Sequence, residues 1–489
     1  MSNSLSINAD PRWRSCVYDG GWSAAEGGEL DVIEKAVGKP LAVVGLGGPR
    51  DLARASMMAA SVQADWAKTA PEVRAKIMRN AANGLEARWD EIAIWIMRET
   101  GAIRPKADFE ISTVVAFFNH AASMLSEHNG LHIPAAGAVI SIARRVPLGT
   151  VGVIAPFNFP MILSMRAVAP ALAVGNAVIL KPDPQTPISG GLLLADILEK
   201  AGLPAGLFHV IPGAADVGEA MCLDPGIRMI AFTGSTTAGR RVGALASGSL
   251  KKVSLELGGK NALVVLDDAD LELAVSAASY GAFLHQGQIC MASGRILVQQ
   301  TIADAFVAKL AEHARRLPFG DPMSNAVALG PLINERQCAR VRQIVNESVE
   351  RGATLVAGGH GEGLFFEATV LDRVGPGMPA FDAEVFGPVA NVVRFGNDDE
   401  AVELANLGEY GLSAGVISRS IDRALALGER IRTGMLHIND QTVVHEANVP
   451  FGGMGASGNG GRIGGPANWD EFTQWQWVTV KTAPPAYPF

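Results

Sequence analysis

The sequence has little cysteine, and its few thiols are scattered along the chain. The four cysteines are Cys16, Cys222, Cys290 and Cys338. No two of them have the short spacing of a zinc site or a redox motif, so we expect no bound metal ion. Scattered thiols in a large chain also favour a reducing compartment, and we therefore expect a cytoplasmic location.

Long hydrophobic runs and clusters of basic residues are missing as well. The most apolar long stretch, Met161–Leu180, contains Arg166, Pro170 and Asn176 and is too interrupted to cross a bilayer. The segment Met1–Cys16 is polar and lacks the apolar core of a secretory signal. The net charge of −8 comes without a basic stripe, so nucleic acid and membranes are not expected partners.

Enough apolar material is present for a large folded core. Hydrophobic residues make up 48% of the chain and charged residues 18%, which argues against a disordered protein. A length of 489 residues favours about two to four domains. Residues 1–50 look irregular, whereas residues 51–128 carry apolar side chains at helical spacing and are predicted to form a scaffold of helices.

Residues 150–257 alternate between short apolar segments and helical stretches, which predicts an α/β fold with a doubly wound parallel sheet. The candidate strands are Val151–Ala155, Ala177–Lys181, Leu207–Ile211, Met229–Thr233 and Val253–Leu257. Ligands of such sheets bind at the carboxyl ends of the strands. Asn158, Lys181, Gly234 and Glu256 all fall at or just after these ends, which indicates a single site.

No glycine-rich phosphate loop follows the first of these strands. Instead, Gly234 and Ser235 follow the fourth, where Ser235 can cap the next helix. The free N–H groups of that helix could face a pyrophosphate, although an ordinary helix cap is the alternative interpretation.

Two further regions complete the expected architecture. Residues 131–148 read as two strands around Ala135-Ala136-Gly137, and residues 258–443 as a second α/β region. That region includes a helix near Ile302–Arg316 and the strands Ala414–Ser418 and Met435–Asn439. The end, Phe472–Val480, has the alternation of an edge strand, and we expect another subunit to pair with it.

Cys290 and Glu256 are the candidate reactive residues. Cys290 lies between small and polar residues within His285–Val298, directly before an apolar run, which predicts a loop with an accessible thiol. The alternative is a buried, inert cysteine. Glu256 ends an apolar strand before Gly258 and Gly259, so the chain can turn away and leave the carboxylate facing a cavity. Its alternative is a carboxylate held by backbone N–H groups.

These segments resemble the NAD(P)-dependent aldehyde dehydrogenase family. The pattern E-L-G-G-K is intact at residues 256–260, and G-Q-x-C is intact at residues 287–290. The resemblance extends from about residue 40 to the C-terminus. Its other motifs are Pro156–Pro160, Lys181-Pro182, Phe232–Ser235, Glu384–Pro388 and Pro450–Gly453.

The resemblance implies a separate catalytic role for each of three residues. Cys290 would attack the aldehyde to give a thiohemiacetal, and its backbone N–H would stabilise the oxyanion together with Asn158. Once hydride has left, Glu256 would activate the water that hydrolyses the thioester. A turn-forming asparagine is the alternative interpretation of Asn158.

The family also implies cofactor contacts. Lys181 would bind the adenosine ribose, Glu384 the nicotinamide ribose, and Gly234 and Ser235 the pyrophosphate, with Phe386 beside the nicotinamide. Phe157 is a further expected cofactor contact. Taken alone, the lysine and the glutamate would be read as solvated charges. NAD-preferring relatives often carry a glutamate three residues after the lysine, where this sequence has Pro184. We therefore expect NAD as the cofactor and tolerance of NADP.

The substrate is expected to be an aromatic aldehyde such as benzaldehyde. The family places an apolar, uncharged set along the substrate tunnel, namely Phe159, Leu163, Leu284, Ile289, Met291 and Phe451. Residues 288–291 and 472–477 also look like those of bacterial benzaldehyde and salicylaldehyde dehydrogenases. Arg166 is the one nearby cation, and an ortho-hydroxyl or carboxylate substituent becomes plausible if it points into the tunnel.

Other functions remain open at this point. The same tunnel would serve an aliphatic aldehyde, and a semialdehyde dehydrogenase is a further alternative. A CoA-acylating enzyme is disfavoured because that branch usually lacks the glutamate present here as Glu256. A non-catalytic structural or binding protein on this fold would be free to lose Cys290 and Glu256, and both are present.

The expected organisation has three parts. Residues 1–128 and 149–256 would form the dinucleotide-binding domain, and residues 257–443 the catalytic domain. Residues 129–148 and 444–489 would form an oligomerisation hairpin and a C-terminal arm. Neither the hairpin nor the last strand can bury its apolar face locally, which predicts a homodimer or homotetramer.

Overall fold

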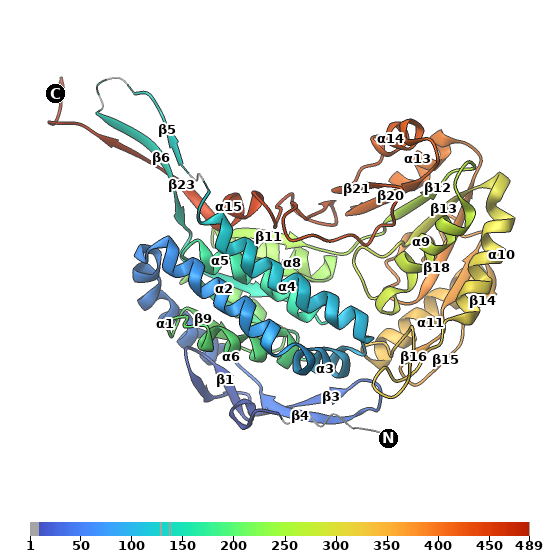
Figure 1. Cartoon of the computed structure of the whole chain (residues 1–489), viewed down its shortest axis with the longest axis horizontal. Helices are drawn as coiled ribbons and strands as arrows, with labels where there is room; N and C mark the ends of the chain where they lie inside the picture. The colour runs from blue at the N-terminus through green and yellow to red at the C-terminus, as the bar shows by residue number, and fades with distance from the viewer. Residues whose placement is uncertain (1–8, 128–129, 136, 138, 489) are drawn as a thin grey trace.

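The computed structural model describes residues 9–127, 130–135, 137 and 139–488, and it consists of two sheet-centred lobes and a projecting arm (Figure 1). The first lobe carries the N-terminal helices and the second lies beyond it in the chain. Among the described residues, no helix is long and apolar enough to span a membrane. No group of three or more His, Cys, Asp or Glu side chains in the same residues could hold a metal ion.

The first lobe is built on a seven-stranded sheet in the order β11-β10-β7-β8-β9-β1-β2. Its parallel strands are β7 (Thr150–Ile154), β8 (Ala177–Lys181), β9 (Phe208–Val210), β10 (Ile227–Thr233) and β11 (Lys252–Glu256). The intervening helices are α5 (Pro160–Ala173), α6 (Leu193–Lys200), α7 (Ala215–Leu223) and α8 (Thr236–Gly248). The predicted doubly wound parallel sheet is thus confirmed, with all five strands in place.

The N-terminal helices of this lobe are α1 (Pro49–Lys68), α2 (Pro71–Ala87), α3 (Trp89–Thr100) and α4 (Arg104–Met124). They confirm the predicted helical scaffold. Apolar faces at helical spacing bury residues such as Trp66, Leu85 and Phe118 in the same core as the sheet. α4 packs against α5, the helix that follows the first strand of the parallel sheet.

The prediction that residues 1–50 are irregular was wrong for residues 16–45, and residues 1–8 lie outside the described residues. Residues 16–45 form β1 (Cys16–Tyr18), β2 (Trp22–Ala24), β3 (Glu29–Glu34) and β4 (Lys39–Gly45). β1 extends the first sheet by pairing antiparallel with β9, and β3 pairs with β4 as a hairpin. The first two strands are too short to display a two-residue period, and their partner lies far along the chain, so local pattern could not reveal them.

The second lobe is built on another seven-stranded sheet, in the order β14-β17-β18-β13-β12-β20-β21. Its strands are β12 (Ala262–Val265), β13 (Arg295–Gln299), β14 (Thr354–Ala357), β17 (Thr369–Asp372), β18 (Val389–Phe395), β20 (Ser413–Ile417) and β21 (Met435–Ile438). Its helices are α9 (Leu271–Phe283), α10 (Gln300–Arg316), α11 (Glu335–Glu350), α12 (Pro379–Asp382), α13 (Asp398–Asn406) and α14 (Ile421–Gly428). The predicted second α/β region, with its helix and both strands, is confirmed.

Two short pairs lie outside these sheets. β15 (Gly361–Glu362) pairs with β16 (Phe365–Phe366), and β19 (Tyr410–Gly411) pairs with β22 (Met454–Gly455). The second pair brings the glycine-rich segment 450–465 back from the second lobe toward the end of β11, where Glu256 also forms an isolated bridge with Gly458. The helix α15 (Ala467–Phe472) then packs against α5.

The arm is a three-stranded sheet of β23 (Thr473–Val480), β6 (Ile140–Pro147) and β5 (Gly130–His132), and it projects from the body (Figure 1). Both predicted hairpin strands are present, although Ala136 of the expected turn lies outside the described residues. The expected pairing of the last strand with another subunit needs correction. All eight residues of β23 pair with β6 of the same chain, which leaves the opposite edge of β23 without a strand among the described residues.

Candidate active site

Cys290 lies in a loop between the short helix η3 (Leu284–Gly287) and β13, as predicted. Its side chain is half-buried and lines a cavity of about 630 Å³. Burial raises the pKa of the thiol to about 12, and the nearby charge of Arg166 opposes that rise. The fully buried alternative does not describe this cysteine, because its side chain lines the cavity.

Two neighbours hold the thiol loop in place. Asn261 donates hydrogen bonds from Nδ2 to the carbonyl oxygens of Cys290 and Ala292, at 2.8 and 2.9 Å. A Cβ at Gly259 would lie 2.5 Å from the Cys290 carbonyl oxygen, so only glycine permits this approach. The segment 256–261 therefore shapes the loop that carries Cys290. Sequence reasoning missed this role of Asn261.

The turn before the thiol is strained. His285 and Gln286 adopt left-handed backbone conformations with φ of 49° and 54°. Such conformations cost about 1–3 kcal/mol each and persist only where contacts fix them. Here Gln286 Nε2 donates to the carbonyl oxygens of Gly101 and Pro331, at 3.0 and 2.8 Å.

Asn158 follows the carboxyl end of β7 and is only 3% exposed. Its Nδ2 donates to the Gln288 carbonyl oxygen at 2.9 Å, which fixes the amide next to the thiol loop. An amide nitrogen carries two hydrogens, so one N–H remains for a ligand in the cavity that Asn158 lines with Cys290. This position suits an oxyanion donor.

Glu256 ends β11 and is 3% exposed, yet neither carboxylate oxygen has a hydrogen-bond partner among the described residues. The alternative of a carboxylate held by backbone N–H groups is therefore wrong. Burial raises its pKa to about 8, while the charges of Arg166 and Arg462 act in the opposite direction. A carboxyl group with such a pKa can exchange protons near neutral pH.

The residues expected to bind a dinucleotide lie at neighbouring strand ends. Ile154 pairs with Lys181, and Thr233 pairs with Glu256, so β7, β8, β10 and β11 end at one edge. Lys181 is buried there, and burial lowers its pKa. The charges of Asp183 and Asp216 act in the opposite direction. Ser235 caps α8 by accepting a hydrogen bond from the Ala238 N–H, as predicted.

The remaining expected cofactor contacts are Glu384 and Phe386 of the second lobe and Phe157 of the first. Glu384 Oε1 accepts a hydrogen bond from the Gly259 N–H at 3.2 Å, and burial raises the pKa of this carboxyl to about 7. A Cβ at Gly258 would lie 2.5 Å from Glu384 Oε2, so glycine keeps this cradle open. Phe386 and Phe157 meet edge to face with their ring centroids 5.9 Å apart. The arrangement fits a dinucleotide that lies across the β-strand ends.

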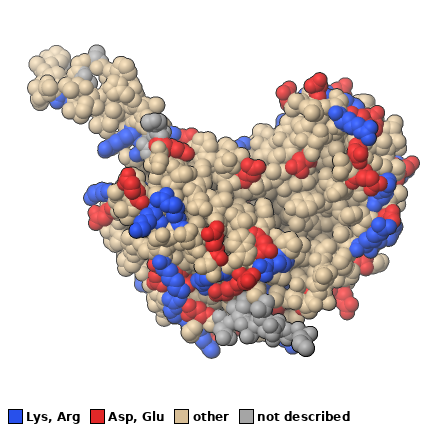
Figure 2. Space-filling view, viewed as in Figure 1, with Lys and Arg blue, Asp and Glu red and all other residues tan. Residues whose placement is uncertain are grey.

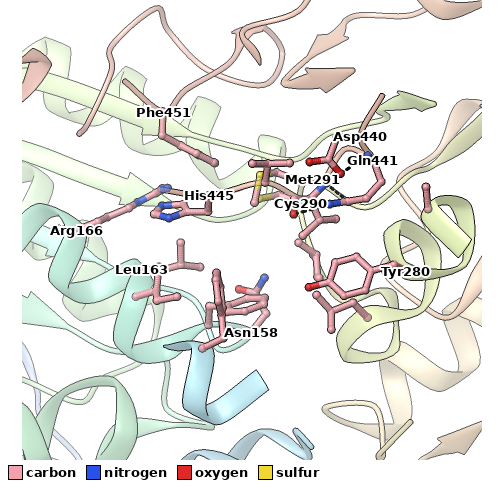
Figure 3. Close-up of a pocket in the computed structure, with 18 of the residues that line it drawn as sticks. Asn158, Leu163, Arg166, Tyr280, Cys290, Met291, Asp440, Gln441, His445 and Phe451 are labelled. Carbon is pink, nitrogen blue, oxygen red and sulfur yellow. Dashed lines mark hydrogen bonds between the residues drawn. The ribbon is translucent and has the colours of Figure 1, made fainter. Parts of the chain in front are cut away.

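All six residues predicted for the substrate tunnel line the cavity that contains Cys290 (Figure 3). They are Phe159, Leu163, Leu284, Ile289, Met291 and Phe451. Sequence reasoning missed a second set from α4, α9 and the segment after β21: Phe109, Leu273, Ser276, Ala277, Tyr280, Gln441 and His445. The α9 members recur at three- and four-residue spacing, which is a signal that could have identified this face.

The expectation of an uncharged tunnel needs correction. Arg166 lines the cavity with only 3% of its surface exposed, and Asp440 lines it as an exposed residue. The Arg166 guanidinium lies over the Phe451 ring at 4.8 Å, and its Nη2 donates to Thr233 Oγ1 at 2.8 Å. Arg166 therefore faces the tunnel. This is the condition under which a ring hydroxyl or carboxylate on the substrate becomes plausible.

Comparison with known proteins gives matches over nearly the whole chain. The model of the "Aldehyde dehydrogenase family" matches residues 22–478. A vanillin dehydrogenase of Amycolatopsis sp. is 50% identical over 99% of this chain and 100% of the relative. The benzaldehyde dehydrogenase [NAD(+)] of Pseudomonas putida is 49% identical over 98% and 99%, respectively. The crystal structure of a salicylaldehyde dehydrogenase from Pseudomonas putida G7, complexed with salicylaldehyde, superposes with a TM-score of 0.94 at 34% identity, covering 97% of this chain and 99% of that one.

Proposed function

The chain belongs to the aldehyde dehydrogenase family, and from that premise we propose that it oxidises an aromatic aldehyde of the benzaldehyde type to the carboxylic acid, with NAD as the hydride acceptor. The observation that carries the proposal is the half-buried Cys290 thiol in an apolar cavity with aromatic walls. The relatives named as vanillin, benzaldehyde and salicylaldehyde dehydrogenases support it.

The proposed chemistry assigns one task to each polar side chain. Cys290 gives its thiol proton to solvent, a loss that the nearby charge of Arg166 favours. The thiolate Sγ then adds to the carbonyl carbon, while Asn158 Nδ2 and the Cys290 backbone N–H hold the oxyanion. NAD, when bound, supplies the acceptor for the hydride that this carbon then gives up. Glu256 takes a proton from water, the water oxygen attacks the thioester, and the acid leaves as the thiolate of Cys290 is restored.

An aromatic ring suits the walls of the cavity. Phe159 and Phe451 offer flat faces, and Leu163 and Met291 complete an apolar surface around the thiol. Burial of a flat apolar ring against such walls is favourable, and a few polar groups then fix its orientation. Arg166 gives the cavity one buried cation, so a ring hydroxyl or carboxylate has a possible partner as well.

The decisive measurement is kcat/KM for benzaldehyde against hexanal and succinic semialdehyde. We expect benzaldehyde to exceed both, because a flat, rigid apolar ring packs against the aromatic walls of the cavity. Hexanal loses more conformational freedom on binding, and succinic semialdehyde brings a charged group into a largely apolar space. Succinic semialdehyde is the more stringent comparison, because its carboxylate can form an ion pair with Arg166. A tenfold advantage of either competitor would overturn the aromatic assignment and favour the aliphatic or semialdehyde alternative.

NAD is proposed as the preferred cofactor, with NADP tolerated. Pro184 stands where a carboxylate would repel a 2′-phosphate, and the neighbouring Asp183 is engaged by the Gln185 N–H at 2.9 Å. Pro184→Glu should lower kcat/KM with NADP about tenfold more than with NAD, because like charges about 4 Å apart repel by roughly 1–4 kcal/mol. Pro184→Gln is the uncharged control. An NADP/NAD ratio that is equal in the two variants would place selectivity elsewhere.

A second copy of the chain is the proposed partner of the arm. Large apolar side chains are exposed along it, namely Leu131, Ile133, Val139, Ile140, Trp475, Trp477 and Val480. Figure 2 shows few charged side chains on this projection. A contiguous exposed apolar surface with a free strand edge marks an interface, and we propose a homodimer or homotetramer on this ground.

The arm provides a direct test of assembly. Trp477 is 68% exposed, and Trp477→Asp should convert the assembly to monomers because it places a charge in the apolar interface. Sedimentation equilibrium gives the subunit number. Val349→Asp, at an exposed position on α11 in the second lobe, is the matched control and should leave the assembly intact. An unchanged oligomer in the arm variant would contradict the interface.

The domain limits and the cellular location are also proposals. We propose that residues 1–128 with 149–256 bind the cofactor, that residues 257–443 carry the thiol, and that residues 129–148 with 444–489 serve assembly. A cytoplasmic location is likewise a proposal, supported by the scattered free thiols. Fractionation of the native cells, with the protein followed by antibody, tests it.

A further inference from the structure

Behind the substrate cavity, three buried nitrogen atoms lack a hydrogen-bond partner among the residues that the structure describes. They are Nη1 of Arg166, Nδ1 of His445 and Nε2 of His120. All three residues line one small cavity of about 10 Å³. That volume holds about one water molecule, and a buried water needs two to four polar partners. An unsatisfied buried polar group costs about 1–3 kcal/mol, so a water at this point would remove a substantial penalty.

The small cavity lies between the substrate cavity and an open pocket on the outside. Arg166 and His445 also line the substrate cavity with Cys290. His120 and His445 also line the outer pocket of about 560 Å³, together with Asn119 and Glu446. His445 thus borders all three spaces, and Figure 3 shows it beside Arg166 at one end of the substrate cavity.

The ring of His445 is held in this position by aromatic neighbours. Its centroid lies 5.5 Å from that of Phe117 and 5.4 Å from that of Phe451. Burial and the charge of Arg166 lower the pKa of His445 to about 3, so the imidazole is neutral. A neutral imidazole has one nitrogen that donates and one that accepts. It can receive a proton on one nitrogen in the same step as it gives up the proton of the other, so the imidazolium that the low pKa disfavours is not formed.

Hydrolysis of the thioester creates a need for such a path. Each turnover leaves a proton on Glu256, whose carboxylate has no hydrogen-bond partner within the described residues. The guanidinium of Arg166 lies close enough to stabilise the charged form of Glu256, and the same side chain borders the small cavity.

We propose that Arg166, His445 and His120 form a water-bridged path through which the proton released in thioester hydrolysis reaches solvent at the α4 side of the molecule. The inference rests on the proposed function, because the proton comes from the water that Glu256 activates. Arg166 orients the bridging water without giving up its own proton, whereas His445 and His120 relay the proton. His120 is a positioning and relay residue, since it borders neither the substrate cavity nor the thiol.

His120→Ala in the full-length enzyme tests the path. The burst of cofactor reduction should keep its amplitude, while steady-state turnover falls about tenfold and the solvent deuterium isotope effect rises. Added imidazole should restore turnover in a saturable manner, because the outer pocket is open to small molecules. Asn119→Ala is the matched control. It is the neighbouring exposed residue on α4 and lines only the outer pocket, so it should resemble the wild type and ignore imidazole.

Two results would overturn the path. In the first, His120→Ala turns over within twofold of wild type. In the second, the variant loses both the burst of cofactor reduction and steady-state turnover, and added imidazole does not restore them. The second pattern would assign His120 a purely structural role. A wild-type protein that oxidises no aldehyde would instead contradict the proposed function, so the two failures are distinguishable.

Discussion

Replacement of Cys290 by alanine should lower aldehyde oxidation by at least about a thousandfold, because no thiohemiacetal can form without the thiol. Cofactor binding should persist, since the side chains expected to hold the dinucleotide come from β8, α8 and the segment before β18. The fold should also persist, because Asn261 donates its hydrogen bond to the backbone carbonyl oxygen of residue 290 and not to the side chain. The measurements are reduction of NAD followed by absorbance and quenching of tryptophan fluorescence by NADH.

The control for this variant is Cys16→Ala. Cys16 is half-buried like Cys290 but lies in β1, outside the cavity, and its loss should leave the rate unchanged. Retention of more than a few per cent of activity in Cys290→Ala would remove the thiol from its assigned role. Comparable loss in the Cys16 variant would point to a general effect on folding.

Glu256→Gln should reduce one equivalent of cofactor per active site and then stall, with steady-state turnover lower by about a hundredfold or more. The amide has nearly the shape of the carboxyl group but cannot accept the proton of the attacking water. Rapid mixing separates the burst from turnover, and acid quench with mass spectrometry should detect the acyl group on Cys290. Loss of the burst as well would mean that Glu256 also activates the thiol.

The same side chain predicts a pH dependence. The pKa of Glu256 is raised to about 8, so the protonated, inactive form predominates at pH 7. Steady-state turnover should therefore rise as the pH passes through about 8, where the carboxylate becomes the major form. Glu256→Gln should lose this rise, because its side chain does not titrate. A profile unchanged by the substitution would assign the titration to another group.

Sequence reasoning grouped Asn158, Lys181 and Glu256 at one site because each lies at or just after a strand end. Parallel strands in a doubly wound sheet end at one edge, so Asn158, Lys181 and Glu256 could be brought together without coordinates. The direction of Arg166 could not be inferred in this way. Every residue of α5 is buried, so its hydrophobic pattern has no face that distinguishes the cavity from the core.

Other features depended on partners that are remote in sequence. The place of β1 in the first sheet is fixed by β9, and the place of β23 by β6, and neither pairing leaves a local pattern. The one-water cavity depends on α4, α5 and the segment after β21, which meet only in the folded chain. Periodicity and motif spacing carry information about neighbours within a segment, and these contacts join separate segments.

The pairing of β6 with β23 also has a consequence for biosynthesis. These strands lie more than 320 residues apart in register, Ile140 facing Val480 at one end and Pro147 facing Thr473 at the other. A nascent chain therefore cannot complete the arm until residues 473–480 have emerged from the ribosome. Contacts of such long range also form slowly, because closing a large loop has a high entropic cost. If the arm joins two subunits as proposed, they can meet through it only after residues 473–480 have emerged. A ribosome stalled before that point would hold a chain whose arm lacks β23.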